Sequence, residues 1–354
     1  MQVLTAKPIK PVGPLTVRIT ILTLLLCSTG QVVAQKDKDV SIPLDHFYVD
    51  RQGPGIFRKL ISKLTFGLST GYGSTTFRHQ LDGFALHQPA TGGPVLFNPN
   101  LPTTGFSNWF NRIEPTTLSI VPGDFVVNSN TAKIGFRSKS LTIPLQATVH
   151  VEFSGRYRIG GGYSFNFVRL GDFKPLTFGG DLRNFNPDFS SFFLKKYFLL
   201  LGASVYRYED YLLTVDMNIG GYSLGKNFDK SVISKGLFFN LGTSIEREMS
   251  EYFRIFVRPS YEFKNYDLNF AEAGQNIKHR LNALYIHLGV TYRIPELRRC
   301  FLKECRIQIN HAHGNREYRS RVHPIWKKQN PHYGENYPNL IKYKGKNKRR
   351  LNPY

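Results

Sequence analysis

Few residues of this chain have types and spacings that could carry chemistry. His79, His87 and Ser107, with Asp82 and Glu114, could supply a base, a nucleophile and an acid for hydrolysis, but no motif or spacing groups them. The sequence therefore predicts that the chain is not an enzyme, and a hydrolase stays an alternative.

A second group consists of cysteines and histidines near the C-terminus. Cys300 and Cys305 are separated by four residues. In an exported chain this spacing favours a local disulfide, with two free thiols as the alternative. His311-Ala-His313 could hold a metal together with His323 or His332, but no thiolate or carboxylate spacing completes a site. The sequence thus predicts no metal and no cofactor.

The N-terminus has the order of an exported protein. A basic start precedes the apolar run Ile19–Cys27, and small residues follow up to Ala34. This order predicts a signal peptide over residues 1–34, because the run is too short to span a bilayer. Lipidation of Cys27 is an alternative, which the bulky Leu26 before it disfavours. Residues 35–62 form a polar lead-in that we expect to be irregular.

Eight later segments alternate apolar with small or polar residues, a period of two that is typical of strands. In Lys196–Ser223, for example, one face carries Leu199 and Leu201 and the other Ser204 and Tyr206. Each segment can cross a bilayer obliquely, for which about 9–11 residues suffice. The segments begin near Leu64, Leu141, Tyr157, Tyr197, Tyr211, Leu237, Phe253 and Leu284.

The connections between these segments alternate in length. Those after the second, fourth and sixth segments are short, whereas the others are longer, including a loop of about 15 residues before the last strand. The longest, residues 79–138, contains Trp109 and Phe110. This segregation predicts an eight-stranded antiparallel transmembrane β-barrel over residues 63–293, with short periplasmic turns and an extracellular loop 79–138. A soluble all-β sandwich is the alternative.

Charged residues fall on the faces opposite the apolar stripes. In a sandwich core they would be costly to bury, whereas the lumen of a small barrel allows them to pair. The predicted lumen network comprises His150, Glu152, Arg158, Asp216, Glu246, Arg254, Arg258, Glu262 and Lys264. An open pore is not expected, because eight strands leave little more than side-chain space.

Two stretches resemble a known family. Ser140–Leu145 reads Ser-Leu-Thr-Ile-Pro-Leu, and Arg158–Tyr163 reads Arg-Ile-Gly-Gly-Gly-Tyr. With the signal end Val33–Gln35, they resemble the eight-stranded outer-membrane β-barrel family of Bacteroidota, the PorT-like group. The resemblance covers about residues 60–293 and implies a role in secretion across the outer membrane, without catalytic residues. The chain departs from that pattern after residue 293, where such barrels end.

The remaining segment, residues 294–354, is strongly basic. From Arg298 onward it holds fifteen Lys or Arg residues against three acidic ones. It is predicted to be a largely irregular periplasmic tail, either simply solvated or docking on anionic lipid, cell wall or an acidic protein. Nucleic acid is not an expected partner. The residues predicted to bind a partner are Arg319, Arg321, Trp326, Lys327, Lys328, Lys344, Lys346, Lys348, Arg349 and Arg350.

These features predict a non-enzymatic barrel in outer-membrane lipid that acts through its basic tail as an anchor or assembly component, for which a secretion machinery is one candidate. One alternative is a surface adhesion module that acts through Trp109, Phe110 and their loop. Another is a lipid-modifying outer-membrane enzyme.

Overall fold

The computed structural model describes residues 54–130, 132–270, 274–313, 316–321 and 323–325. The predicted signal peptide 1–34, most of the lead-in and residues 326–354 lie outside these ranges. The lead-in ends in a short helix, α2 (Ile56–Ile61), where an irregular segment was predicted. In the described ranges, no helix has the length and apolarity needed to cross a membrane.

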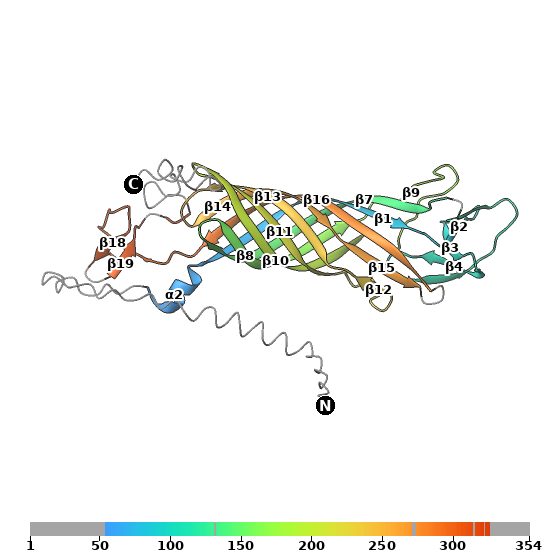
Figure 1. Ribbon diagram of the computed structural model, residues 1–354, viewed down its shortest axis with the longest axis horizontal. Coiled ribbons are helices and arrows are strands. Elements are labelled where there is room, and N and C mark those ends of the chain that lie inside the picture. The colour runs from blue at the N-terminus through green and yellow to red at the C-terminus, as the bar shows by residue number, and fades with distance from the viewer. Residues whose placement is uncertain (1–53, 131, 271–273, 314–315, 322, 326–354) are drawn as a thin grey trace, which may run out of the picture. The chain divides into compact units, whose positions relative to one another are not determined.

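Eight long antiparallel strands form a closed ring (Figure 1). Strand β1 pairs with β16 from Thr65↔Arg293 to Gln80↔Lys278 and also with β7, so the sheet closes on itself. The predicted eight-stranded antiparallel barrel is confirmed. In ring order the strands are β1 (Leu64–Gln80), β7 (Gly135–Phe153), β8 (Tyr157–Arg169), β10 (Ser191–Tyr208), β11 (Tyr211–Ser223), β13 (Phe238–Glu248), β14 (Phe253–Phe263) and β16 (Gln275–Arg293).

Three short turns lie at one end of the ring. They join β7 to β8, β10 to β11 and β13 to β14, over residues 154–156, 209–210 and 249–252. Ser154 (φ 54°) and Glu209 (φ 48°) take the left-handed conformation that tight hairpin turns use. The other connections are longer and lie at the opposite end, as predicted.

The connection before the last ring strand differs from the prediction. Instead of a loop, β15 (Asn265–Phe270) pairs with the start of β16, from Asn265↔Arg280 to Phe270↔Gln275. A short strand, β12 (Ile233–Lys235), pairs with β15 in turn. Tyr266, Leu268 and Phe270 are buried on one face of β15. The loop prediction was wrong because the polar residues between these positions concealed a strand of period two.

A β-bulge near the end of β10 reverses which residues point into the lumen and which point outward. The register with β11 shifts between Ser204 and Tyr206, which adds one residue to β10. Tyr206 is therefore 43% exposed on the outer wall, and Arg207 is buried in the lumen. The prediction that Tyr206 faces inward was wrong. Asp216 on the neighbouring strand is buried, as predicted.

The outer wall of the ring is apolar. From Phe66 to Thr76, β1 rises about 33 Å, which a tilt of about 40° reduces to about 25 Å, the height of a typical lipid-facing band. Exposed apolar side chains on this wall include Phe66, Leu68, Tyr72, Ile143, Leu145, Ile159, Tyr163, Tyr197, Leu199, Leu241, Ile245, Tyr261, Leu284, Ile286 and Leu288.

The long first loop is folded. It forms a five-stranded sheet in the order β5-β4-β3-β2-β6, beyond the long-loop end of the ring (Figure 1). Because β1 extends to Gln80 and β7 begins at Gly135, the loop spans residues 81–134 and is shorter than predicted. Its strands are β2 (Ala85–Gln88), β3 (Val95–Asn98), β4 (Leu101–Asn108), β5 (Glu114–Thr117) and β6 (Phe125–Asn128), and β9 (Lys174–Pro175) from the next long loop pairs with β7.

Part of the predicted irregular tail is also folded. Strands β17 (Arg298–Arg299), β18 (His311–His313) and β19 (Arg316–Arg319) form a sheet in the order β17-β19-β18. Arg58 of α2 donates to the carbonyl oxygens of Pro295 at 3.2 Å and Glu296 at 2.8 Å. The chain beyond the barrel is thus tied to the helix that precedes it.

Candidate functional site

The lumen near the short turns is filled by a network of ion pairs. Arg158 donates from Nη2 to Glu246 Oε2 at 2.8 Å, and its Nε lies 2.9 Å from Glu152 Oε1. Arg254 reaches Glu152 at 2.6 Å and Glu248 at 3.0 Å. Arg254 also lies 3.7 Å from Glu246, and Arg207 pairs with Glu248. The three carboxylates, those of Glu152, Glu246 and Glu248, therefore each contact two guanidinium groups. Such sharing offsets the cost of burying the charges.

A second group, built on the ion pair between Arg258 and Asp216, lies in the middle of the lumen. Arg258 donates from Nε to Asp216 Oδ1 at 2.6 Å and from Nη2 to Asn240 Oδ1 at 2.7 Å. Ser244 donates to the other Asp216 oxygen at 3.0 Å. The side chains come from β11, β13 and β14, so this pair cross-links three strands.

A third group lies nearer the long-loop end. Glu262 accepts from Lys196 at 2.7 Å and from Lys264 at 2.6 Å, so one carboxylate lies between two ammonium groups. Lys196 also lies 5.0 Å from the centre of the Tyr285 ring, a cation–π contact. All three charged residues are buried.

The nine residues predicted to line the lumen all belong to these groups or lie beside them. His150, the ninth, is buried 3.6 Å from Glu152. Lys196, Arg207 and Glu248 complete the network and were not predicted. Lys196 lies two positions from Phe198, and Glu248 two positions from Glu246, so each lies on the inward face of its strand. The alternation alone could therefore have identified them. Only the bulge explains why Arg207 points inward.

Little space remains in the lumen. One void among these side chains is about 40 Å³ and is lined by residues that include His150, Arg158 and Arg258. A water molecule occupies about 30 Å³ in the liquid, so a void of this size holds only isolated waters. The charged side chains therefore fill this part of the lumen.

Aromatic residues close the long-loop end. Trp109 and Phe110 of the first loop are both 0% exposed. Trp109 stacks on Phe185 at 4.2 Å between ring centres, and Tyr266 donates from its hydroxyl to the Phe110 carbonyl at 2.7 Å. The folded loop thus seals the mouth with its own aromatic residues. The alternative of an adhesion surface formed by these two residues is contradicted by their burial.

The residues considered for hydrolysis do not assemble. His79 is buried and stacks on Phe173, whereas His87 bonds to Asp124 at 2.8 Å. Glu114 pairs with Arg112 at 2.6 Å. Among the residues described, no hydrogen-bonded set of serine, histidine and acid links these positions.

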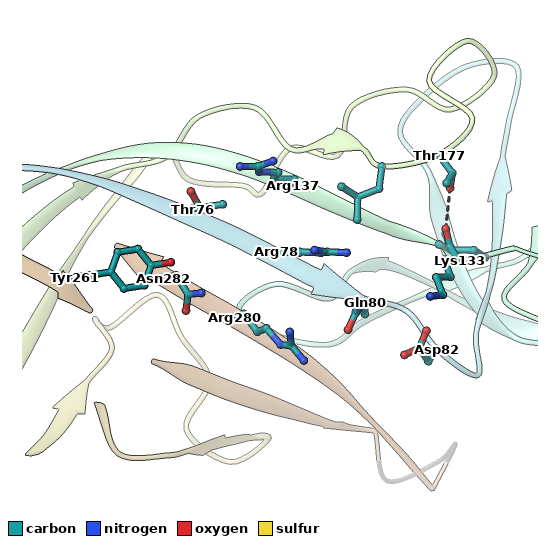
Figure 2. Close-up of a pocket in the computed structure, with 12 residues that line it drawn as sticks. Thr76, Arg78, Gln80, Asp82, Lys133, Arg137, Thr177, Tyr261, Arg280 and Asn282 are labelled. Atoms are coloured by element: carbon teal, nitrogen blue, oxygen red, sulfur yellow. Dashed lines mark hydrogen bonds between the residues drawn. The ribbon is translucent and has the colours of Figure 1, made fainter. Parts of the chain in front are cut away.

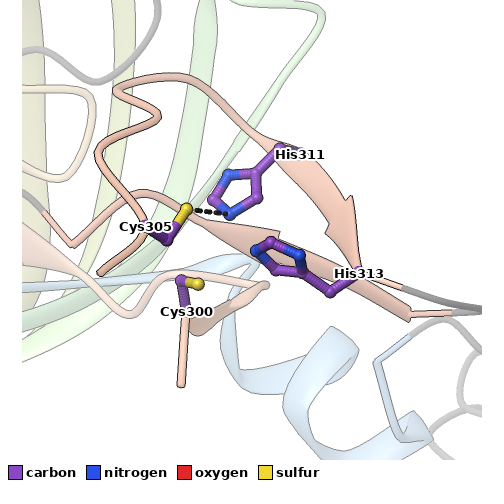
Figure 3. A group of neighbouring side chains, drawn as sticks. All are labelled: Cys300, Cys305, His311 and His313. Carbon is purple, nitrogen blue, oxygen red and sulfur yellow. Dashed lines mark hydrogen bonds between the residues drawn. The ribbon is translucent and has the colours of Figure 1, made fainter. Parts of the chain in front are cut away.

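A cluster of cysteine sulfur and histidine nitrogen atoms lies in the small sheet formed by β17, β18 and β19 and the loop between its strands (Figure 3). Cys300, Cys305, His311 and His313 each place one possible ligand atom within 4.8 Å of all the others. Both cysteines are free thiols, so the predicted disulfide was wrong. Burial raises the pKa of the Cys300 thiol above its ordinary value. The sequence predicted no metal site because no thiolate spacing completes one, and it did not anticipate that folding brings these four residues together.

Two residues of the predicted partner-binding set are described. Arg321 donates to the carbonyl oxygens of Leu302 at 3.0 Å and Cys300 at 3.4 Å, so it supports the cysteine loop. Arg319 donates to the Ser320 carbonyl at 3.3 Å. The others lie outside the described residues, namely Trp326, Lys327, Lys328, Lys344, Lys346, Lys348, Arg349 and Arg350.

No family model matches the chain, and no curated protein matches it. Solved outer-membrane proteins are similar in structure. The protease OmpT from Escherichia coli is 13% identical, with 65% of this chain and 96% of that chain covered and a TM-score of 0.30. OprG from Pseudomonas aeruginosa is 10% identical, with 70% and 98% covered and a TM-score of 0.32.

Neisserial surface protein A is 8% identical, with 63% and 96% covered and a TM-score of 0.30. Values this low support no inference about activity. The closed ring, the apolar outer wall and the charged lumen are the features of a bacterial outer-membrane β-barrel. The protein is such a barrel.

Proposed function

We propose that this protein is a closed, non-enzymatic barrel that anchors its basic C-terminal unit, residues 294–354, at the periplasmic face of the outer membrane as an assembly component. The observation that carries the proposal is the filled lumen, which leaves no route for a solute. A barrel without a channel contributes its position in the membrane and the surfaces at its two ends. A part in protein secretion is the form of this role that the PorT-like resemblance suggests.

The C-terminal unit offers a docking surface at the short-turn end. A hollow of about 370 Å³ is lined by Pro54 and Gly55 and by residues 297–299 and 316–318. Phe301, which also lines the hollow, is 61% exposed, and Ile309 of the same C-terminal unit is 45% exposed. Exposed apolar side chains among arginines suit a protein partner with an acidic rim. Adhesion through Trp109 and Phe110 has no such support, because both are buried.

The proposal can be tested by affinity purification of the tagged full chain from cross-linked outer membranes. The substitutions Arg298→Glu and Arg299→Glu together reverse two charges at the hollow. The matched control, Lys230→Glu with Lys235→Glu, reverses two exposed charges at the opposite end. We expect the first pair to lose co-purifying proteins that the control retains. An unchanged set of partners, with the barrel still folded, would exclude this docking surface.

A further inference from the structure

We infer that Cys300, Cys305, His311 and His313 bind one zinc-type divalent metal ion that holds the C-terminal sheet together. The inference goes beyond the proposed anchoring role and does not rest on it. In a tetrahedral zinc site, Zn–S distances of about 2.3 Å place two sulfur atoms about 3.8 Å apart. The four ligand atoms lie within 4.8 Å of one another, so they need to move inward by about 1 Å or less to reach this geometry.

The hydrogen bonds of His311 orient it as a ligand. Its Nδ1 lies 2.9 Å from the Ile309 carbonyl oxygen, which can only accept, so Nδ1 carries the proton. Nε2 then presents a lone pair and lies 3.2 Å from Cys305 Sγ. A backbone carbonyl that fixes the imidazole tautomer is the usual outer contact of a metal-bound histidine.

His313 completes the pair on β18. Positions 311 and 313 share one face of the strand, because side chains alternate. Their rings lie 4.8 Å apart, and the Nε2 atom of His313 is shielded from solvent without a hydrogen-bond partner. A shielded imidazole nitrogen without a partner is costly unless it gains a ligand. A metal ion supplies one.

The cysteines are held from the other side of the cluster. Cys300 is 2% exposed, and its backbone N–H donates to the Arg319 carbonyl on β19 at 3.0 Å. Arg321 holds the carbonyls of Cys300 and Leu302. The ion would therefore join β17, the 301–310 loop and β18, in a unit that has little apolar core of its own.

The chemistry of the donors selects the metal. Two thiolates and two neutral imidazoles form the Cys2His2 set of structural zinc sites, whereas Mg²⁺ and Ca²⁺ prefer oxygen ligands. Coordination releases the two thiol protons to solvent, and the two thiolate charges balance the divalent cation. No oxidant is needed, in contrast to a disulfide between the same sulfur atoms.

The test uses the full-length protein purified from outer membranes without reductant. We expect about one zinc per chain by elemental analysis and, after exchange, a cobalt(II) spectrum with tetrahedral bands and thiolate charge transfer. Cys305→Ser and His311→Asn should each lose the bound metal, whereas the control His323→Asn should retain it. A heat-dependent shift in gel mobility reports whether each barrel is still folded.

Two results would overturn the inference. One is a Cys300–Cys305 disulfide in the isolated protein, found by mass spectrometry after thiol alkylation. The other is a reduced protein that binds cobalt without thiolate bands or binds it equally well after Cys305→Ser.

A different observation concerns the outer wall near the long-loop end. Arg78 pairs in register with Arg137 on one side and with Arg280 on the other, and all three side chains are exposed on the outer face. Residues opposite each other in neighbouring strands have Cβ atoms about 5 Å apart. Figure 2 shows the three arginines around a hollow of about 580 Å³, with Asp82 at its edge. We call these residues the arginine row.

The arginine row lies just above the apolar wall. Going down the outer face, the next register row is Thr76, Lys139 and Asn282, and below it the wall becomes apolar from Leu284 and Tyr72 onward. Each two-residue step is about 7 Å along the strand. The row therefore lies at the level of the lipid headgroups, in the leaflet that faces the long loops.

None of the three arginines of the arginine row is ion-paired within the described residues. No ion pair or side-chain hydrogen bond of Arg78, Arg137 or Arg280 occurs in the described part of the chain. Like charges directly opposite in a sheet repel, and Lys139 adds another. Two acids lie nearby, Asp82 at the edge of the hollow and Asp172 in a neighbouring hollow with Arg137 and Lys139, so the positive charges outnumber them. An anion bound between the arginines would reduce this repulsion.

We propose that the arginine row binds a phosphate group of an outer-leaflet glycolipid. Guanidinium forks match phosphate oxygens in a bidentate geometry. The acyl chains of the same lipid would lie along Leu284, Ile286 and Tyr72, directly below. The ligand is thus a phosphorylated lipid, in which one molecule satisfies both the charged row and the apolar wall.

Native mass spectrometry of the full-length protein with added lipid A tests this proposal. We expect adducts with diphosphorylated lipid A but not with its dephosphorylated form. Arg78→Gln, Arg137→Gln and Arg280→Gln together should weaken binding at least about tenfold, because the charge-assisted hydrogen bonds to the phosphate are lost. The control removes three exposed charges elsewhere, with Lys195→Gln, Lys230→Gln and Lys235→Gln.

Equal adducts in the triple arginine variant and the wild type would refute the proposal, provided that both show the mobility shift of a folded barrel. Equal binding of dephosphorylated lipid A would also refute it. Displacement of lipid A by an equal concentration of inorganic phosphate would assign the row to free phosphate instead and overturn the lipid assignment.

Discussion

Glu262→Gln is expected to destabilise the barrel far more than removal of one of its lysine partners. Glu262 lies 2.7 Å from Lys196 and 2.6 Å from Lys264, and it is 1% exposed. At an effective dielectric constant of about 20, each contact contributes about 6 kcal/mol of attraction. Most of this offsets desolvation. Removing one partner of a buried pair costs about 3–5 kcal/mol, because the other charge stays buried.

Lys264→Met has a different effect. It leaves Lys196 paired with Glu262, so no charge is stranded, and the expected cost is about 1 kcal/mol. Glu262→Gln strands two ammonium groups. The free energy of unfolding should therefore separate the two variants by at least about 2 kcal/mol, more than a tenfold difference in the unfolding equilibrium constant.

The assay is reversible urea unfolding in lipid vesicles, followed by tryptophan fluorescence and by gel mobility. Lys195→Met, on the outer face of β10 next to Lys196, is the control for the loss of a lysine and should be nearly neutral. Equal costs for Glu262→Gln and Lys264→Met would show that Glu262 is not the shared counter-ion and would refute the network as described.

Three further predictions concern the barrel and its mouth. The intact protein should show a heat-dependent gel shift and a β-rich spectrum in detergent, and a freely soluble monomer would contradict the barrel. Trp109→Ala should lower the free energy of unfolding of the folded loop, residues 81–134, by about 3–5 kcal/mol. The loop should then be cleaved faster by protease while the ring stays resistant. Unchanged cleavage would show that Trp109 does not hold the loop closed over the barrel. Gly220→Ala should lower assembly yield, because a Cβ there would lie 2.0 Å from the Tyr197 carbonyl oxygen, whereas Gly179→Ala, with open space around it, should be neutral.

The barrel and most of its lumen could be predicted from the sequence because the side-chain period of a strand is two. Glu246 and Arg254 were identified by parity alone, without knowledge of their partners. The alternation of inward and outward residues breaks where a β-bulge adds one residue to a strand. Arg207 was missed because it follows such a bulge. The alternation also fails where polar residues conceal a strand, as in Asn265–Phe270.

Contacts between distant segments could not be predicted. Trp109 reads as an exposed loop residue, because its burial depends on Phe185 from another loop. The spacing of Cys300 and Cys305 favoured a disulfide, since nothing in the local sequence shows that His311 folds back to within 3.2 Å of Cys305. These features depend on tertiary structure.

The distribution of charges around the lumen has a consequence for the order of assembly. Strand β1 contributes no Asp, Glu, Lys or Arg to the interior, and Gly73 leaves the space that the Tyr285 ring of β16 occupies. The ion pairs lie among the strands from β7 to β14. A curved, unclosed sheet can therefore neutralise its charges first, and the β1–β16 seam can join last over small, uncharged residues. The chain's two ends would then meet without a desolvation barrier at the seam.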